Sequence, residues 1–531
     1  MALNPKPHFT WRRFFKKLKQ IVIGKNLLQV FLRIYILIVL LGAVLLWSSW
    51  THSEWTYDAG TSVTEEHVYT FWDALFVSCS AFSNTGLTPL DVKNFYNTFG
   101  QFVVFTLIGL GGIGIVSLFY VVWNFFKKNT EVRINHLVLL QSERGSNKYS
   151  TSFKSIRFCV IFIILVEILF GFIMSCWICF FPVHEVKVID NNPITGFDPD
   201  KFIVGHGNYI DALWQGMFFS VSAMNNAGFD LLKEPFSLAA FRNDWNIFFQ
   251  MMVVILIIFG GIGYPLIFDV YEKIRLKKKG VKHKFTLFTK ICLVSYFLVL
   301  LVGLGISYGF EFGAADKNTL VGIECHDGQW GHNVLFNKIF AVFFNTVSTR
   351  SAGFSTFDQY ILTKATQTNY SIMMFIGANP SSTGGGIRTT TLAIVFVSIW
   401  HLIRGHRNVT LFKKTIPSST VKTSFIVCFV ALILVIVSSI AIDYSPAYDG
   451  TTLIRDQNVS LLETIYEVTS AFGTVGLSMG LTYKIGAIGK AILIINMFIG
   501  QLGVSTALLV WFKKMSKSKD ILYPTEDVKI G

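Results

Sequence analysis

Residues 225–230 read Asn-Asn-Ala-Gly-Phe-Asp, and this stretch has three near-copies in the chain, at 83–88, 350–355 and 473–478. In each copy one glycine follows a small residue and precedes Leu or Phe, and the four glycines recur at similar intervals along the chain. Each copy also follows a short apolar run and precedes a long one. A repeat this regular indicates one structural unit used four times along a chain of 531 residues.

The composition is that of a membrane protein. Hydrophobic residues make up 52% of the chain and charged residues only 15%, against about 25% charged residues in a typical soluble protein. Eight mostly apolar stretches are about 18 residues or longer, which is enough to cross a bilayer as a helix. They lie at 30–47, 101–126, 158–181, 248–270, 291–308, 371–400, 425–442 and 491–512.

Lys and Arg residues are concentrated in alternate connecting segments. The segments 1–33, 127–157, 273–290, 403–422 and 513–531 contain 33 of them, whereas 51–68, 182–208, 309–332 and 443–460 contain four. The positive-inside rule places the first set in the cytoplasm, so both termini are expected there. Topology and anionic lipid account for the net charge of +14 without a nucleic-acid partner. We therefore predict a multi-pass protein of the plasma membrane.

About 12 apolar and small residues precede each glycine stretch, which is too few to span a bilayer but enough for about three helical turns. Each unit is therefore predicted to contain an outer helix, a short re-entrant helix, a glycine loop and an inner helix. The predicted fold is an all-α polytopic membrane protein with four such fused repeats, pseudo-fourfold symmetry and eight transmembrane spans. The expected boundaries are a basic cytosolic tail at 1–29, repeats at 30–126, 158–272, 288–404 and 423–512, cytosolic loops at 127–157, 273–287 and 405–422, and a cytosolic tail at 513–531.

The glycine loops have the chemistry of an ion filter. Non-helical backbone at membrane depth is tolerated only where it is buried in protein or lines a water-filled path. Glycine allows φ values that turn successive carbonyl groups toward one axis, and the short helices point their negative dipole ends at the same place. Helix packing also uses glycines, but four matches in the same context favour a cation filter of backbone carbonyls. The predicted ion-binding residues are Asn84, Thr85, Gly86, Asn226, Ala227, Gly228, Ser351, Ala352, Gly353, Thr474, Val475 and Gly476.

These residues resemble the Trk/Ktr/HKT superfamily of potassium transporters, most closely the membrane subunit of bacterial Ktr systems. The other stretches that carry the resemblance are Ser-Thr-Arg-Ser-Ala-Gly-Phe at 348–354 and Gly-Ala-Asn-Pro-Ser-Ser-Thr-Gly-Gly-Gly-Ile-Arg-Thr at 377–389. The resemblance implies one pore per chain and, because Gly86 is not replaced by serine, K⁺ as the preferred ion. It also implies a homodimer on a cytosolic ring of nucleotide-binding regulatory subunits.

No cofactor is expected in this chain itself, because it has no GxGxxG in a strand–helix context and any nucleotide would bind the separate regulatory subunit. Coupling to Na⁺ stays open, since a sodium transporter or a sodium-coupled potassium symporter would carry similar loops. A membrane enzyme is the competing class of function. The chain contains no HExxH motif, and its Ser, His and Asp residues are dispersed over different repeats, so it is not expected to be an enzyme.

The third inner helix is interrupted by Pro380 and by Gly384, Gly385 and Gly386. Proline and three glycines cannot continue a lipid-facing helix, so the break must face protein or water. A static kink is one interpretation, but three glycines are more than a kink needs. In the resembling family this segment is an intramembrane gate, and we expect a gate here. No other inner helix is expected to be broken.

Arg388 follows the three glycines and is expected either to pair with a carbonyl or carboxylate or to reach the cytosolic face. The family often has an arginine where Gln501 stands, so this gate is expected to hold cations back less, unless Gln501 only hydrogen-bonds the gate loop. Asp230 is expected at the outer mouth, where a carboxylate concentrates cations. Arg350 would repel a cation in the pore and is expected to pair behind the filter.

Asp73, Glu463 and Glu167 are among the acidic residues of the predicted membrane region. Asp73 and Glu463 occupy the same position in their repeats, each at the same distance in sequence before a filter glycine, Gly86 or Gly476. They are expected to cap or anchor the short helices. Glu167 lies in the middle of a predicted span, where a lone carboxylate is a candidate functional residue.

Overall fold

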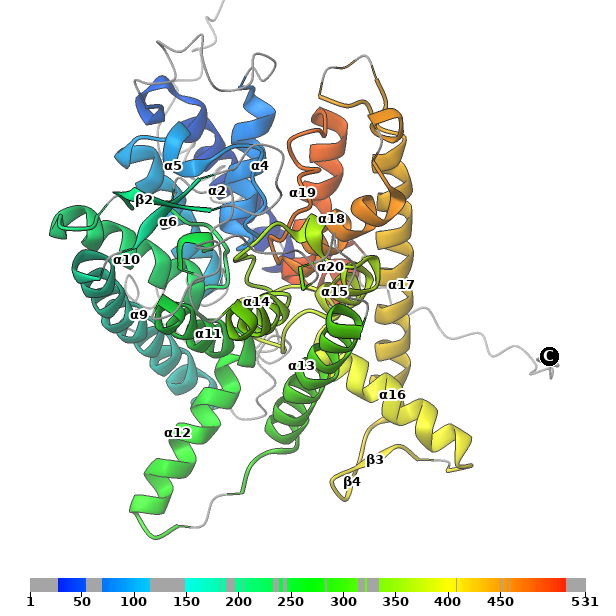
Figure 1. Ribbon diagram of the computed structural model, residues 1–531. Helices are drawn as coiled ribbons and strands as arrows, with labels where there is room; N and C mark the ends of the chain where they lie inside the picture. Colours follow the sequence, from blue (N-terminus) through cyan, green and yellow to red (C-terminus); the bar gives the residue numbers. More distant parts are fainter. Residues whose placement is uncertain are drawn as a thin grey trace, which may run out of the picture.

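The computed structural model is mostly helical (Figure 1). It describes residues 27–53, 69–114, 149–181, 183–187, 196–203, 205–232, 238–241, 246–281, 284–313, 320–321, 334–406, 408–448, 450, 452–457 and 459–511. The predicted N-terminal tail before residue 27, the C-terminal tail after residue 511 and most of the 127–157 loop lie outside these residues.

The elements follow the predicted order of long outer helix, short helix, loop and inner helix. In the first repeat they are α2 (Leu27–Trp47), η1 (Ser49–Thr51), α4 (Phe71–Phe82), α5 (Val92–Phe95) and α6 (Thr98–Ile113). In the second they are α9 (Tyr149–Phe180), the antiparallel pair β1 (His184–Lys187) and β2 (Gly196–Phe202), α10 (Tyr209–Met224), η2 (Ala239–Phe241), α11 (Ile247–Ile262) and α12 (Tyr264–Lys278).

The second half of the chain repeats this order. The third repeat contains α13 (Leu287–Gly313), α14 (Val334–Ser348), η4 (Gln359–Ile361), α15 (Lys364–Ile376) and α16 (Thr389–Ile403). The antiparallel pair β3 (Thr410–Leu411) and β4 (Lys414–Thr415) leads into the fourth, which contains α17 (Ser418–Asp443), η5 (Ile454–Gln457), α18 (Leu461–Gly473), α19 (Ala487–Leu502) and α20 (Val504–Trp511).

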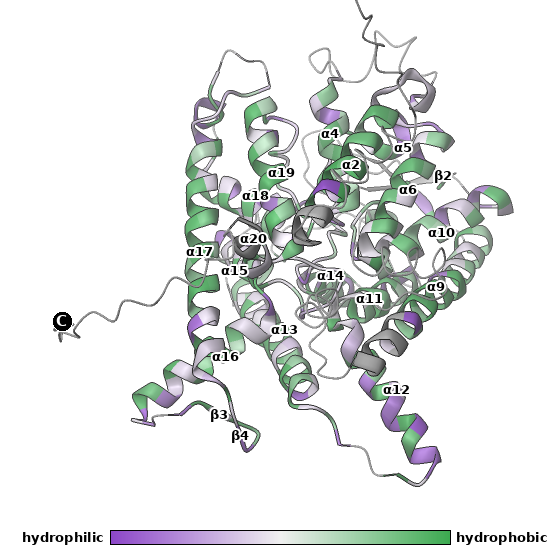
Figure 2. Cartoon of the chain, turned by 180° about the vertical axis from the view of Figure 1, so that it is seen from behind, coloured by the Kyte–Doolittle hydropathy of each residue, from purple (hydrophilic) through white to green (hydrophobic). Residues whose placement is uncertain are grey.

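The helices have the apolar exterior of a multi-pass membrane protein. Within the described residues, α9 (over Arg157–Phe180), α13 and α17 are each long and apolar enough to cross a bilayer, and α11 with α12 forms a fourth candidate that bends by 94°. Hydrophobic residues cover α2, α6, α9 and α17, whereas hydrophilic residues gather on α12 and on the β3–β4 hairpin (Figure 2). The count of eight spans stays a prediction, because the other apolar helices are shorter than a full span.

Glycines end or interrupt the inner helices of the first, second and fourth repeats. Gly114 follows the last residue of α6, Gly263 separates α11 from α12, and Gly503 separates α19 from α20. Their φ angles are 79°, 95° and 83°, and their ψ angles are 133°, 133° and 137°, a conformation that only glycine adopts readily. The expectation that only the third inner helix is broken was therefore wrong. The missed signal is a second glycine slightly earlier in each helix, at 111, 260 and 500.

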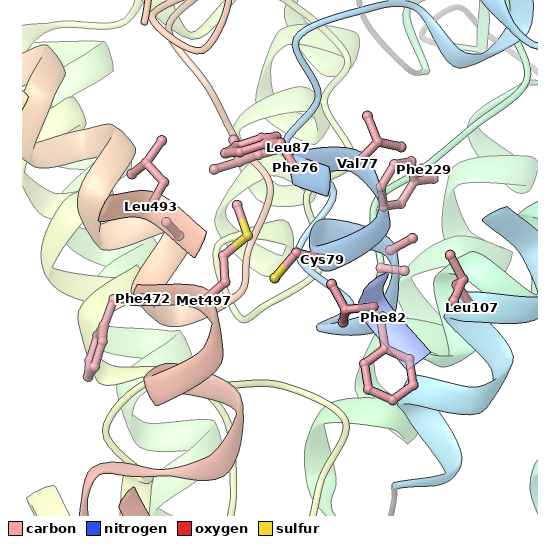
Figure 3. Close-up of a cluster of buried hydrophobic side chains, with 14 of the residues drawn as sticks. Phe76, Val77, Cys79, Phe82, Leu87, Leu107, Phe229, Phe472, Leu493 and Met497 are labelled. Atoms are coloured by element: carbon pink, nitrogen blue, oxygen red, sulfur yellow. The ribbon is translucent and has the colours of Figure 1, made fainter. Parts of the chain in front are cut away.

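The first and last repeats pack against each other in one hydrophobic core. Figure 3 shows Phe76 and Phe82 of α4 and Leu107 of α6 in the same cluster as Phe472 of α18 and Met497 of α19. All of these side chains are nearly or fully buried, and buried apolar area is the main stabilising contribution to such packing. The contact brings the two ends of the chain together, so that the four repeats can surround one centre.

A buried ion pair lies at the same junction. The Lys490 ammonium on α19 is 2.5 Å from the Asp73 carboxylate on α4, and both side chains are at most 1% exposed. Asp73 also forms a capping box with Thr70, as Glu463 does with Ser460 at the start of α18. The prediction that these two acids cap the short helices is confirmed. Removing one partner of a buried pair leaves the other uncompensated, at a cost of about 3–5 kcal/mol.

The two described basic connections lie at one end of the molecule. α12 extends from the helical body and ends in Arg275, Lys277 and Lys278, and the β3–β4 hairpin carries Lys414 at the same end (Figure 1). This placement fits the predicted loops at 273–287 and 405–422, whose boundaries and cytosolic side stay predictions.

Candidate ion-conduction site

The four glycines of the repeated stretches form a closed ring, Gly86–Gly228–Gly353–Gly476. A Cβ placed on any of them would lie within 2.6 Å of the carbonyl oxygen of the residue that precedes the next glycine. In chain order these carbonyls belong to Ala227, Ala352, Val475 and Thr85. The last contact, from Gly476 to Thr85, closes the ring, so a side chain at any of the four positions would displace the neighbouring carbonyl.

The backbone of the four loops is similar. The ring glycines have φ angles of 92°, 71°, 78° and 100°, and the residue two positions earlier is also left-handed in every loop: Asn84, Asn226, Ser351 and Thr474. In the first, second and fourth loops, the amide one residue before the glycine donates to the carbonyl six residues before it, at 2.8 Å. In the third loop, the Ala352 amide donates at 2.9 Å to the carbonyl of Ser348, which lies five residues before Gly353 and not six.

The short helices end at the ring. α4, α10 and α18 end four, four and three residues before their ring glycines, and α14 ends five residues before Gly353. The carbonyl end of a helix carries a partial negative charge, equivalent to about half an elementary charge. Four such ends and the loop carbonyls place negative potential at the centre of the ring, which would favour a cation without any acidic side chain.

A cavity of 520 Å³ opens on one side of the ring. Its lining includes all four ring glycines and the residues that follow each of them in the chain, among them Leu87, Phe229, Ser355 and Ser478. Tyr483 also borders it. The ring glycines thus form part of the wall of this cavity.

Three carboxylates line this cavity, and sequence analysis singled out only one of them. Asp230 is joined by Asp91 and Asp358, which each follow a ring glycine by five residues, in the first and third repeats. Each of the three accepts a hydrogen bond at 2.9 Å from the amide two residues ahead. Burial raises the pKa of Asp91 and Asp358 above the ordinary aspartate value, although those amides oppose the shift.

No three acidic, His or Cys side chains among the described residues are close enough to hold a metal ion. The three carboxylates of the cavity therefore do not form one metal-ligand cluster.

On the other side of the ring lies the α15–α16 loop, residues 377–388, which contains the three consecutive glycines. The Gly385 amide donates to the Thr474 hydroxyl at 2.7 Å, and the Gly386 amide donates to the Phe472 carbonyl at 3.1 Å. A Cβ on Gly384 would lie 2.5 Å from the Ser351 hydroxyl, and one on Gly385 would lie 2.7 Å from the Thr474 side chain. Only Gly386 of the three has a left-handed φ, 75°. Gly384 and Gly385 are therefore explained by close contact with the third and fourth loops.

The loop is also fixed at its start to the end of α11. The Asn379 amide donates to the Gly261 carbonyl at 3.2 Å, and its side chain donates to the Ile262 carbonyl at 2.9 Å. The Tyr264 amide, just past the bend at Gly263, donates to the Ser381 carbonyl at 3.1 Å. The loop thus touches the second, third and fourth repeats.

Arg388 pairs with carbonyls, which was one of its two expected roles. Its guanidinium donates to the Gly384 carbonyl and, at 3.0 Å, to the Gln501 carbonyl. The Gln501 side chain donates to the Phe82 carbonyl at the end of α4, at 3.0 Å. Gln501 therefore contacts the α15–α16 loop through its backbone, while its side chain binds the first repeat.

Arg350 is fully buried behind the third loop, and the ring of Tyr296 lies 5.1 Å from its guanidinium carbon. No carboxylate pairs with it among the residues described, so the partner behind the filter is an aromatic ring. Glu167 on α9 accepts a hydrogen bond at 2.7 Å from the side chain of Asn225, three residues before Gly228. Sequence analysis gave Glu167 no partner, because nothing in the spacing of 167 and 225 indicates contact.

Comparisons with known proteins agree with one another. Residues 37–522 match the family model of TrkH, described as a cation transport protein. An uncharacterized cation transporter of Mycoplasma genitalium is 34% identical, over 97% of this chain and 99% of its own length. The Ktr system potassium uptake protein D of Bacillus subtilis is 32% identical, over 87% of this chain and 90% of its own.

Among solved structures, the potassium transporter TrkH from Vibrio parahaemolyticus aligns with a TM-score of 0.60 and 12% identity, over 93% of this chain and 86% of that one. At this identity the match concerns the fold, which is that of a helical membrane protein. The family model covers most of the chain, and the two relatives named above align with it over nearly their whole lengths. The chain therefore belongs to the TrkH family of cation transport proteins, within the Trk/Ktr superfamily.

Proposed function

We propose that this protein takes up K⁺ across the plasma membrane through a single pore at the ring Gly86–Gly228–Gly353–Gly476. The observation that carries the proposal is the closed contact of the four glycines with the carbonyls of Thr85, Ala227, Ala352 and Val475. Carbonyl oxygens can replace the hydration shell of K⁺, which is the cargo of the pore and not a cofactor. The Bacillus subtilis relative, named a potassium uptake protein, supports the choice of ion. As a member of a transporter family the chain is not an enzyme.

The filter consists of the loop residues at and before the glycines, Asn84–Gly86, Asn226–Gly228, Ser351–Gly353 and Thr474–Gly476. The cavity with Asp91, Asp230 and Asp358 is the outer mouth. Its carboxylates raise the local concentration of cations in front of the filter, and low ionic strength strengthens this effect.

The α15–α16 loop is the gate. Of its glycines Gly384, Gly385 and Gly386, the first two lie directly against the third and fourth loops, so a cation leaving the ring on that side meets backbone instead of water. Arg388 binds the Gly384 carbonyl within the loop and the Gln501 carbonyl outside it. Both are hydrogen bonds to backbone, and both can be exchanged for water when the loop moves.

The proposed assembly is the one that the resemblance implies. In it the protein works as a homodimer with a cytosolic, nucleotide-binding regulatory ring that controls the gate, and the chain itself carries no cofactor. The basic end with α12 and the β3–β4 hairpin supports a cytosolic face at which such a ring would sit, with both termini on the same side.

Growth of a cell that lacks K⁺ uptake, at low external K⁺, tests the proposal. The wild-type chain should restore growth, and Gly86→Ser should raise Na⁺ uptake relative to K⁺ uptake, because its Cβ would lie 2.5 Å from the Ala227 carbonyl. Gly309→Ser on α13 is the control, since nothing lies within 4 Å of that position. Failure of the inserted wild-type chain with its regulatory partner present, or equal selectivity of both variants, contradicts the proposal.

A further inference from the structure

The residue two positions before each ring glycine is left-handed, but the four residues differ in how well they tolerate this. Their φ angles are 54° at Asn84, 56° at Asn226, 78° at Ser351 and 47° at Thr474. Asparagine adopts the left-handed region comparatively readily, whereas a β-branched residue there is strained. The fourth loop therefore depends on its surroundings to hold Thr474 in this conformation.

In the first two repeats the side chain at this position contacts its own inner helix. With its amide nitrogen turned toward the Ala81 and Ile108 carbonyls, Asn84 donates to both at 3.1 Å, and its oxygen accepts from the Gly112 amide at 2.9 Å. The oxygen of Asn226 lies 2.6 Å from the Cβ position of Gly260 on α11. These two loops are thus braced by helices that run past them.

In the last two repeats the same position contacts the α15–α16 loop. The Thr474 hydroxyl accepts from the Gly385 amide at 2.7 Å, and the Ser351 hydroxyl is 3.3 Å from the same amide. Ser351 also lies 2.8 Å from the Thr474 carbonyl and 3.0 Å from the Gly473 carbonyl, close enough to donate to either. Both side chains are fully buried, so water does not substitute for these contacts while the loop is in place.

We infer that Ser351 and Thr474 are positioning residues that make ion selectivity depend on the gate. When the α15–α16 loop withdraws, Thr474 loses the Gly385 amide that holds its strained backbone, and the carbonyls of the fourth loop are free to move. The conformations of the gate and the filter therefore change together. The third and fourth filter loops carry this coupling, and the first and second do not. This inference rests on the proposed function, because it names how selectivity at the same site is regulated.

Rubidium and sodium uptake by the purified full-length chain in liposomes tests the inference. Thr474→Val keeps the shape of the side chain and removes the hydroxyl, and it should lower the ratio of rubidium to sodium uptake by about fivefold, the effect of one lost hydrogen bond. Thr469→Val is the matched control on α18, because the Thr469 hydroxyl bonds only the Tyr466 carbonyl of its own helix, and it should leave the ratio unchanged.

Two more variants distinguish a loss of selectivity from a loss of folding or of uptake rate. Ser351→Ala should lower the ratio in the same direction, and it keeps the inference testable where Thr474→Val fails to fold. Thr474→Asn relieves the left-handed strain and should retain more selectivity than Thr474→Val. A changed uptake rate with an unchanged ratio in both hydroxyl-free variants overturns the inference and leaves the pore intact. A wild-type chain that takes up no rubidium even with its regulatory partner bound overturns the proposed function as well.

Discussion

The third inner helix differs from the other three at one contact. In the first, second and fourth repeats a glycine of the inner helix, Gly111, Gly260 or Gly500, lies against a carbonyl at the end of its own short helix, belonging to Phe82, Met224 or Phe472. Gly377 is the counterpart in the third repeat, because it follows Gly353 at the same distance in sequence as Gly500 follows Gly476. It lies instead against the Gly385 carbonyl of the α15–α16 loop. The loop therefore occupies the place of a direct helix contact.

This difference separates a permanent contact from a releasable one. Two helices in van der Waals contact through a glycine separate only if the repeat unfolds locally. The loop is held by hydrogen bonds from the Ala378 amide to the Gly385 carbonyl at 3.3 Å and from the Ile387 amide to the Phe375 carbonyl at 3.1 Å. Each such bond contributes only about 1 kcal/mol net, so a regulatory partner could supply the energy to break them.

The largest effect is expected from breaking the permanent contact. Gly111→Ala places a methyl group on the Phe82 carbonyl, and backbone cannot move away as a flexible side chain can. Overpacking of this kind costs about 1–3 kcal/mol or more, so the melting temperature should fall and rubidium uptake should drop by at least about tenfold. The control is Gly109→Ala on the same helix, which has nothing within 4 Å. Equal behaviour of the two variants would show that this helix contact is not required.

A smaller and opposite effect is expected at the third repeat. Gly377→Ala places its methyl group on the Gly385 carbonyl, at φ 58° and ψ −161°, which only glycine adopts readily. The strain, about 1–3 kcal/mol, falls on the closed loop, so rubidium uptake per folded molecule should rise about fivefold or more. Size-exclusion chromatography gives the folded amount. A loss of uptake as large as that of Gly111→Ala would place Gly377 with the permanent contacts.

The sequence predicts the filter loops better than it predicts the inner helices and the buried side-chain pairs. The ring glycines were predictable because each loop repeats the same local requirement for a left-handed glycine. The breaks at Gly263 and Gly503 were missed because glycines in an apolar helix are usually tolerated, and their effect here depends on the helix that passes nearby. Lys490 with Asp73 and Glu167 with Asn225 join distant parts of the chain. No local pattern indicates such pairs, since packing alone brings them together.

The outer mouth should not distinguish the first repeat from the third. Asp91 and Asp358 occupy the same position in the first and third repeats and bind equivalent backbone amides at 2.9 Å. Asp91→Asn and Asp358→Asn are therefore expected to raise the KM for rubidium equally, by about twofold at low ionic strength and less at high ionic strength. Asp456→Asn, at an exposed site outside the cavity lining, is the control. Unequal changes in KM for the two variants would show that the third repeat differs from the first at the outer mouth as well as at its inner helix.

The pH dependence of the KM gives the sharpest form of this prediction. Burial raises the pKa of both Asp91 and Asp358, so each carboxylate is charged above its raised pKa and becomes neutral as the pH falls through it, at a higher pH than an exposed aspartate. The attraction for cations is lost in the same window, and the KM of the wild type should rise there. In the double variant the KM should already be high at neutral pH and should change less on acidification. A pH profile identical to that of the wild type would mean that other groups set the field at the mouth, and the first and third repeats would then be alike in structure without sharing a function.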